Sequence, residues 1–127
     1  MNKEIKQTDI VIVGAGPSGC MAANILVDSG RSVILLDKND FPRHKPCAGG
    51  LTPKTVEELP FEITDLKQHD SETMLFKFTN GKTVDLNNES GACKMVVREE
   101  FDEFFFNYVV GKGVGFVRGK VLKIDEN

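Results

Sequence analysis

A glycine-rich turn between two apolar runs constrains the fold of this chain more than any other feature. Residues 9–13 read D-I-V-I-V, a β-branched run that predicts a buried strand. The turn, G-A-G-P-S-G at 14–19, leads into residues 20–29, whose apolar positions recur along one helix face. A second apolar run, S-V-I-L-L at 32–36, ends in Asp37. The order strand, helix, strand predicts a βαβ unit with parallel strands and a right-handed crossover.

The turn contains the residues that a dinucleotide phosphate requires. Gly14, Gly16 and Gly19 form G-x-G-x-x-G: the first permits a tight turn, the second lets the backbone approach a pyrophosphate, and the third lets helix and strand pack closely. The helix N-terminus offers N–H groups to the phosphates. Asp37 can accept hydrogen bonds from the adenosine ribose and would repel a 2′-phosphate, which disfavours NADP. The pattern suits FAD and NAD equally, and a glycine-rich turn that binds nothing is the simpler alternative.

The remaining chain mixes loops, hairpins and one further helix. Residues 39–51 lack apolar periodicity and contain Pro42, Pro46 and two adjacent glycines, which predicts an extended loop. Thr52-Pro53 predicts the start of a short helix that Pro60 ends. Asn80-Gly81 predicts a hairpin turn. We further expect strands at 74–78, 83–86, 94–97, 114–117 and 120–124, and a helix from Arg98 whose stripe of Phe101, Phe104, Phe105, Tyr108 and Val109 faces the core.

Composition excludes several classes of protein. The chain has 127 residues and a net charge of −3, which argues against a nucleic-acid-binding protein. No apolar run approaches the roughly 20 residues of a membrane helix, and the N-terminus lacks the apolar stretch of a signal peptide. Three cysteines and two histidines without motif spacing argue against a disulfide framework and a metal site. We therefore expect a cytoplasmic protein without a transmembrane segment.

Three motifs resemble one known family. The segment P-R-H-K-P-C-A-G-G-L at 42–51 resembles the P-x-x-K-x-C-x-G-G motif of the geranylgeranyl reductase family, FAD-dependent enzymes related to the aromatic hydroxylases. The start, D-I-V-I-V-G-A-G-P-S-G, and the stretch V-V-R-E-E-F-D-E-F-F at 96–105 are similar to that family too. The chain departs from the usual pattern at Ala48, often glycine, at Asp37, more commonly glutamate, and at Phe105, usually leucine.

The resemblance implies a fold and a domain arrangement. The fold would be α/β, a Rossmann-like βαβ FAD-binding unit with added antiparallel hairpins, forming the N-terminal portion of a larger flavoprotein. Residues 1–127 would be one FAD-binding domain, with 51–97 as the start of a substrate-side β region. Family members continue with a G-D-A-x-G segment and a substrate-binding region that these residues do not contain. We therefore expect the isolated chain to be inactive.

The resemblance also implies roles for individual residues. Ser18 and the three motif glycines would line the ADP half of FAD, Asp37 would bind the adenosine ribose, and the backbone of Val121 would meet the adenine. Cys47, Ala48 and Gly50 would lie near the isoalloxazine ring, and Arg98 would reach the flavin from its helix. Cys47 is the candidate catalytic residue, its pKa lowered by the neighbouring basic residues Arg43, His44 and Lys45.

Each of these roles has a simpler structural alternative. Cys47 could be an ordinary loop thiol and Arg98 a surface charge, whereas Arg43 and Lys45 either neutralise the pyrophosphate or are solvated. Cys20 and Cys93 are expected to be packing residues.

The implied reaction is the reduction of carbon–carbon double bonds in an isoprenoid or prenyl-lipid substrate. Reduced FAD would deliver hydride, and NAD(P)H or a ferredoxin-like protein would supply the electrons. The full-length enzyme could contact a membrane peripherally. Two alternatives stay open: a non-catalytic nucleotide-binding module, and half of an NAD-dependent dehydrogenase, which the 42–51 motif disfavours.

Overall fold

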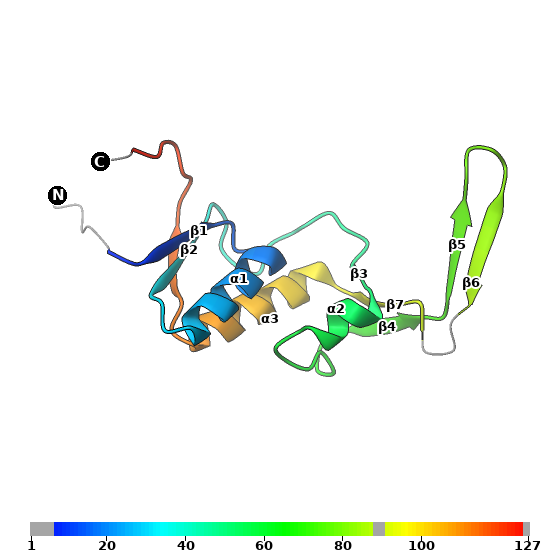
Figure 1. Ribbon diagram of the computed structural model, residues 1–127, viewed down its shortest axis with the longest axis horizontal. Coiled ribbons are helices and arrows are strands. Elements are labelled where there is room, and N and C mark those ends of the chain that lie inside the picture. Colours follow the sequence, from blue (N-terminus) through cyan, green and yellow to red (C-terminus); the bar gives the residue numbers. More distant parts are fainter. Residues whose placement is uncertain (1–6, 88–90, 126–127) are drawn as a thin grey trace. The chain divides into compact units, whose positions relative to one another are not determined.

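The computed structural model describes residues 7–87 and 91–125 and divides the chain into two compact units (Figure 1). The first unit comprises Met1–Arg43 and Asp102–Asn127, and the second comprises His44–Phe101. The division runs through helix α3 (Arg98–Gly111).

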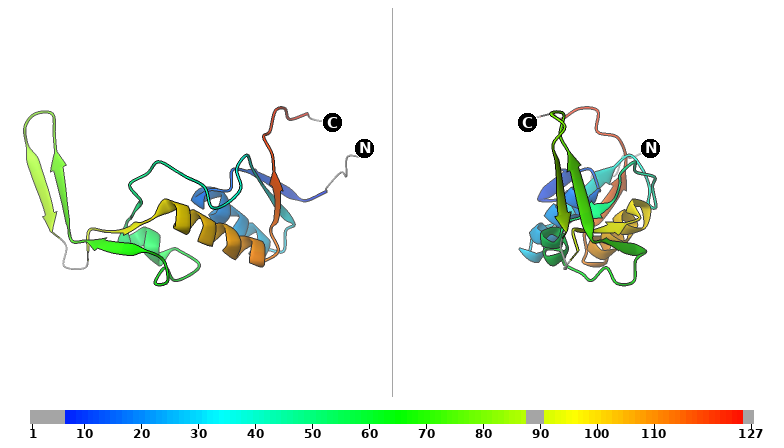
Figure 2. Two further views of the ribbon diagram at one scale, coloured as in Figure 1. Left: turned by 180° about the vertical axis from the view of Figure 1, so that it is seen from behind. Right: turned by 90° about the vertical axis from the view of Figure 1, so that its right-hand side faces the viewer.

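A parallel sheet forms the centre of the first unit. Its strands are β1 (Ile10–Val13), β2 (Val33–Asp37) and β8 (Gly115–Arg118), in the order β1-β2-β8. Ile10 pairs with Val33, and Ile34 pairs with Gly115. Helix α1 (Pro17–Asp28) connects β1 to β2 and packs against both strands (Figure 2). The predicted parallel βαβ unit and the α/β class are therefore confirmed.

Helix α1 begins earlier than its apolar periodicity predicts. Pro17 occupies the first turn, where its missing N–H leaves no hydrogen bond unmade. The helix ends at Ser29, and Gly30 follows with a φ of +81°, the left-handed conformation common after a helix. Local turn chemistry therefore sets both ends of this helix.

Only one face of the parallel sheet is well shielded. Val33 and Leu35 are buried, together with Phe105 and Val109 of α3, whose aromatic stripe contributes to the core as predicted. The alternate residues Val11 and Val13 are 52% and 62% exposed. The apolar run of β1 thus forms a strand whose residues alternate between half-buried and exposed, where the sequence predicted full burial, because the helices of this unit cover one side.

Hydrogen bonds between Asp9 and Ser32 join the starts of β1 and β2. The Ser32 N–H and hydroxyl donate to Asp9 Oδ2 over 2.8 and 2.7 Å, and the Asp9 N–H donates to Ser32 Oγ. These hydrogen bonds, chiefly that from the Ser32 backbone, lower the pKa of Asp9. The contact fixes the strand register at this end of the sheet.

The predicted pair of C-terminal strands is wrong. Residues 115–118 form β8, but this strand pairs with β2 in parallel, and residues 119–125 form no strand. Leu122 and Ile124 are 85% and 80% exposed. Alternating apolar residues alone do not make a strand, because a strand must also pair with a neighbouring strand. Residues 119–125 pair with no strand among the described residues.

The second unit is built from short antiparallel strands. Strands β3 (Gly50–Leu51), β7 (Cys93–Val96) and β4 (Gln68–Ser71) pair in the order β3-β7-β4. Helix α2 (Pro53–Glu57) starts as predicted, with the Thr55 N–H donating to the hydroxyl of its N-cap Thr52. Strand β4 was not predicted, because Q-H-D-S has no apolar alternation and pairs through its backbone.

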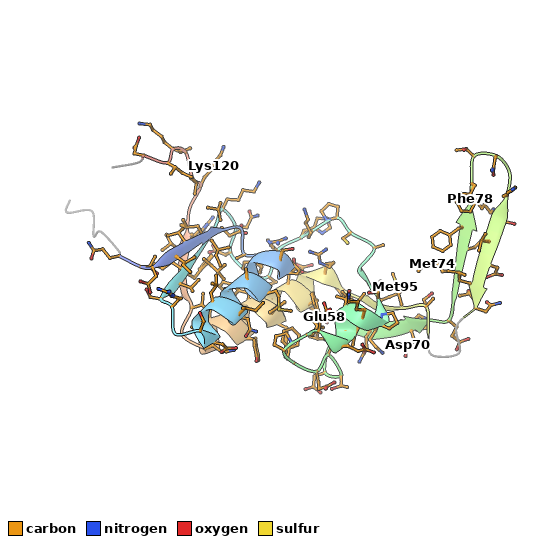
Figure 3. The ribbon with its side chains drawn as sticks, in the orientation of Figure 1. Glu58, Asp70, Met74, Phe78, Met95 and Lys120 are labelled. Carbon is orange, nitrogen blue, oxygen red and sulfur yellow. The ribbon has the colours of Figure 1, made fainter. Side chains whose placement is uncertain are left out.

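A predicted hairpin completes this unit. Strands β5 (Thr73–Lys77) and β6 (Thr83–Asn87) pair antiparallel around Asn80-Gly81, where Gly81 has a φ of +81°. Met74 and Phe78 mark its apolar side chains (Figure 3). Several are more than two-fifths exposed: Leu75, Phe76, Phe78, Val84 and Leu86.

The described residues contain neither a membrane-spanning helix nor a cluster of metal-binding side chains. No described helix is long and apolar enough to cross a membrane. Within residues 7–87 and 91–125, no group of His, Cys, Asp and Glu side chains is arranged to hold a metal ion.

We predict that Gly49→Ala destabilises the protein far more than Gly81→Ala. Both glycines have φ near +80°, a conformation that costs alanine about 1–2 kcal/mol. A Cβ at Gly49 would lie 2.0 Å from the Val96 carbonyl oxygen, whereas nothing lies within 4 Å at Gly81. Gly49→Ala should therefore lose about 1–3 kcal/mol more in urea unfolding followed by circular dichroism. Equal losses for the two variants would contradict this.

Candidate functional site

The glycine loop between β1 and α1 has the conformation that its motif predicts. Gly14 has a φ of +103°, a left-handed conformation that glycine adopts most easily. A Cβ at Gly19 would lie 1.9 Å from the Gly14 carbonyl oxygen, so only glycine lets the first helical turn approach the loop. The loop is thus closed by two glycines with different physical roles.

The first turn of α1 presents backbone N–H groups that the helix itself does not pair. Gly16 is the N-cap residue and accepts a hydrogen bond from the Cys20 N–H (2.9 Å), but it has no side chain to cap the helix. The Ser18 and Gly19 N–H groups lie in the first turn, where a helix provides no intrahelical partner. These donors and the positive end of the helix dipole favour an anion, and a phosphate is the natural one for this loop.

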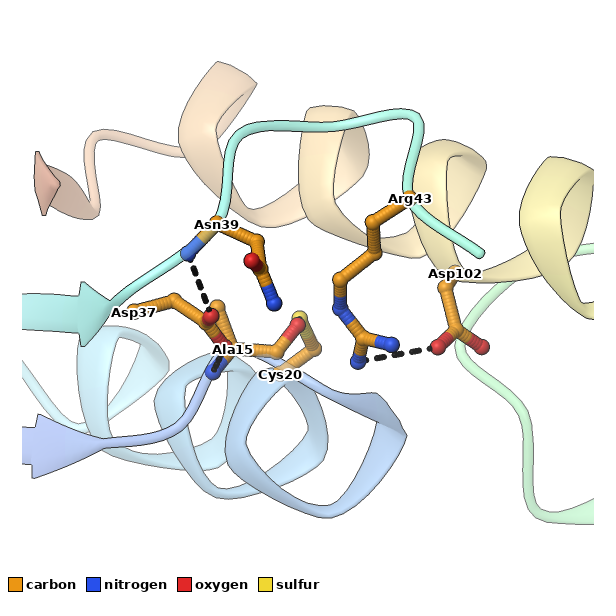
Figure 4. A network of polar contacts seen from close by, with 6 residues as sticks. All are labelled: Ala15, Cys20, Asp37, Asn39, Arg43 and Asp102. Atoms are coloured by element: carbon orange, nitrogen blue, oxygen red, sulfur yellow. Dashed lines mark hydrogen bonds and ion pairs between the residues drawn. The ribbon is translucent and has the colours of Figure 1, made fainter. Parts of the chain in front are cut away.

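Asp37 at the end of β2 is bonded to the glycine loop. The Ala15 N–H donates to Asp37 Oδ2 over 2.9 Å, and the Asn39 N–H donates to Oδ1 over 3.0 Å (Figure 4). A carboxylate has about four acceptor sites, so both oxygens can still accept further hydrogen bonds. Asp37 therefore shapes the loop and also keeps the capacity to bind a ribose hydroxyl.

An ion pair lies beside the same loop. Arg43 Nη2 is 3.1 Å from Asp102 Oδ2, and the Asp102 side chain is fully buried. A Cβ built on Gly16 would lie 3.2 Å from Arg43 Nη2, so the guanidinium occupies the space next to the loop (Figure 4). The side chain of Arg43 is 12% exposed, which answers one open alternative: it is not a solvated surface charge.

Cys20 packs beneath this ion pair. Its thiol donates to the Ala15 carbonyl oxygen over 3.3 Å, and burial raises its pKa to about 12, with Asp102 adding to the rise. The thiol therefore stays protonated at neutral pH. This confirms Cys20 as a packing residue.

The cysteine loop belongs to the second unit. Cys47 and Ala48 are exposed, and the Gly49 N–H donates to Cys47 Sγ over 3.4 Å. The Val96 N–H donates to the Gly49 carbonyl oxygen (2.9 Å), and Gly50 of β3 pairs with Met95 of β7. The two adjacent glycines thus fix the loop against β7, which leaves Cys47 on an accessible turn.

The structure also places two further predicted site residues. Arg98 is the first residue of α3, as predicted, and is half-buried. Val121 is 36% exposed and lies in the stretch after β8 that is not a strand. Their roles toward a flavin remain predictions.

Two residues that make close contacts in the structure, Asp102 and Gly49, were not predicted from the sequence. Asp102 is buried and lies between the buried Phe101 and the half-buried Glu103. It was missed because the periodicity of a helix assigns charged residues to the face that points to solvent. Gly49 was not among the expected site residues, although the Gly49-Gly50 pair in the motif was a usable signal.

The first unit fits the ADP half of FAD. Its loop combines a left-handed Gly14, a close approach at Gly19 and unpaired first-turn donors, which is the cradle that a pyrophosphate needs. Asp37 supplies a carboxylate at the end of the neighbouring strand. The residues present therefore match the cofactor in shape and in donor chemistry.

The sequence of this chain is similar to those of known proteins. The family model for the FAD binding domain matches residues 7–95. An uncharacterized protein of Methanosarcina barkeri is 36% identical over 122 residues, covering 96% of this chain and 31% of that protein. A geranylgeranyl diphosphate reductase of Rhodobacter capsulatus is 31% identical over 126 residues, covering 94% and 30%. The chain thus spans less than a third of the length of either relative.

Two solved structures share the fold. A geranylgeranyl bacteriochlorophyll reductase-like protein from Thermoplasma acidophilum superposes with a TM-score of 0.73 at 18% identity, over 86% of this chain and 29% of that one. The flavin-dependent brominase Bmp2 superposes with a TM-score of 0.75 at 20% identity, over 96% and 32%. The fold class and the resemblance to geranylgeranyl reductases are confirmed, as is FAD as the cofactor. With its residues 7–95 matched, the chain belongs to the FAD binding domain family.

Proposed function

We propose that this chain is the ADP-binding part of a flavoenzyme of the geranylgeranyl reductase type, which reduces carbon–carbon double bonds of isoprenoid chains. The proposal rests on the hydrogen bond between the glycine loop and Asp37, and on the Cys47 motif at 42–51 that follows it in the sequence. Fold likeness alone does not choose the reaction, because a reductase-like protein and a brominase share this fold. The motif at 42–51 and the reductase relative favour reduction.

In this proposal the first unit binds the ADP half of FAD. The N–H groups of Ser18 and Gly19 donate to the pyrophosphate at Gly14 and Gly16, and Asp37 accepts from the ribose hydroxyls. Val121 offers its backbone to the adenine. A 2′-phosphate would meet the Asp37 carboxylate, which excludes NADP from this position.

The second unit serves the isoalloxazine end in this proposal. Cys47, Ala48 and Gly50 form a small-residue loop past which a planar ring can lie, and Arg98 donates to the flavin. When bound, FAD supplies hydride chemistry. Cys47 either holds the proton that the second alkene carbon receives or shapes the pocket around that carbon.

Several properties of the whole protein follow from the same proposal. The substrate is an isoprenoid or prenyl lipid, and NAD(P)H or a ferredoxin-like protein donates the electrons. The enzyme works in the cytoplasm and contacts the membrane peripherally, where its apolar substrate resides. A non-catalytic nucleotide-binding module is the alternative, and an alkene-reduction assay of the full-length protein separates the two.

We predict that the chain binds FAD and ADP through the glycine loop, and that Gly16→Val abolishes this binding. A valine at Gly16 would push its side chain against Arg43 Nη2 and into the space above the loop. The matched control is Gly111→Val, because nothing lies within 4 Å of a Cβ at that helix-end glycine. Calorimetric titration would contradict the assignment if Gly16→Val bound FAD as the wild type does.

We predict that Asp37→Ala weakens ADP binding by about 1–3 kcal/mol, the range for lost hydrogen bonds to a charged group. Both the ribose contact and the bond from the Ala15 N–H would be removed. Asp40→Ala, an exposed neighbour paired with Arg118, serves as the control for a change of charge in the same region. An affinity unchanged in Asp37→Ala would remove this residue from the site.

We predict that Cys47→Ser in the full-length enzyme leaves FAD bound but slows alkene reduction by ~10²-fold or more, as the loss of a proton-transfer group does. The thiol is exposed and accepts a hydrogen bond from the Gly49 N–H, which a serine hydroxyl can accept as well. Cys93→Ser is the control thiol. The 127-residue chain alone should show no turnover, so measured reduction of a prenyl substrate by it would contradict the second half of this prediction.

A further inference from the structure

A buried carboxylate lies next to the proposed phosphate site without belonging to it. Asp102 in α3 has a fully buried side chain, and Arg43 Nη2 lies 3.1 Å from its Oδ2 atom. A carboxylate removed from water is costly unless it is paired and hydrogen-bonded. Both residues belong to the first unit, so the contact lies within one compact body.

The Arg43 guanidinium is fixed from three directions. Asp102 and the Gly16 position both lie against Nη2, and the centroid of the Phe41 ring lies 5.2 Å from the central carbon. Phe41 in turn stacks on Phe106 at 4.4 Å between ring centroids. The guanidinium is therefore held rigidly at the glycine loop.

This guanidinium has donor capacity that the chain does not use. An arginine has five N–H donors. Its Nε atom is buried and has no hydrogen-bond partner among the described residues, while Nη2, which pairs with Asp102, lies next to Gly16. Buried donors without a partner are rare in proteins and point to a missing acceptor.

We propose that Asp102 is a positioning residue for nucleotide binding: it holds Arg43 so that the guanidinium donates to the diphosphate at the glycine loop. The inference rests on the proposed function, since it requires that the loop bind a diphosphate. The pair is formally neutral, so its contribution is directed hydrogen bonding rather than net charge. High salt should therefore preserve the contribution, whereas it would screen a long-range attraction.

A purely structural role is the competing interpretation. In that case the pair would only attach the segment before Arg43 to helix α3, and its loss would weaken every ligand equally. Adenosine and ADP distinguish the two roles, because they share the base and the ribose but only ADP carries the diphosphate.

The test titrates the 127-residue chain with ADP and with adenosine, for the wild type and for Asp102→Asn, Arg43→Ala and the double variant. Asp102→Asn keeps the shape of the side chain and removes its charge. Glu99→Gln is the matched control, since it makes the same chemical change at an exposed position of α3. Circular dichroism melting establishes that each variant is folded at the titration temperature.

We expect Asp102→Asn and Arg43→Ala each to weaken ADP binding about tenfold or more, with adenosine binding unchanged. The double variant should bind ADP no more weakly than Arg43→Ala, because Asp102 acts through Arg43. The ratio of wild-type to variant affinity should be the same at low and high salt. Glu99→Gln should bind both ligands as the wild type does.

Equal losses of ADP and adenosine, or additive losses in the double variant, would overturn the positioning role while leaving the loop assignment intact. Wild-type chain that binds neither FAD nor ADP would overturn the proposed function and this inference together. Where Asp102→Asn does not fold, Arg43→Lys decides: it keeps the charge without the planar fork and should lose ADP affinity selectively. An unchanged ADP affinity in Arg43→Lys would then contradict the proposal.

Discussion

The hydrogen bond from the Ala15 N–H to the Asp37 carboxylate is the contact on which the first unit depends. It joins the loop after β1 to the end of β2 over 2.9 Å, next to the bond from the Gly14 N–H to the Leu36 carbonyl (2.7 Å). The Asp37 carbonyl also accepts from the Gly119 N–H at the end of β8 (2.8 Å). One residue therefore connects the carboxyl ends of all three strands, which is where an open parallel sheet binds its ligands.

The hydrogen bond between the glycine loop and Asp37 suits an aspartate at the end of β2. An aspartate keeps its carboxylate close enough to receive the Ala15 N–H, whereas a glutamate would carry the same group one methylene further along. Because both oxygens already accept a backbone N–H, a ribose would bind to a carboxylate that is oriented beforehand. Such pre-orientation lowers the entropy lost on binding. Loop geometry and ligand recognition therefore depend on the same side chain.

The sequence predicted those structural features that are determined by residues close together in the chain. The glycine motif, the Thr52-Pro53 helix start and the Asn80-Gly81 hairpin are decided within a few residues, and all three were found. The misses depend on distant partners: β4 exists because β7 offers its backbone, and residues 120–124 form no strand because no described strand pairs with them. Asp102 was missed because its burial depends on an arginine far away in the sequence, which helix periodicity cannot reveal.

The distribution of chemistry over the two units explains why one fold serves different flavoenzymes. In the proposed function the loop, Asp37 and the buried ion pair act on the ADP half, a part of the cofactor that does not react, so they can stay the same when the reaction changes. Both a reductase-like protein and a brominase share the fold of this chain. Reaction identity must then come from residues toward the reacting ring, and within this chain the candidate is the Cys47 turn. That turn is attached to β7 through the backbone of Gly49, so substitutions of its side chains leave this attachment and the parallel sheet of the first unit in place.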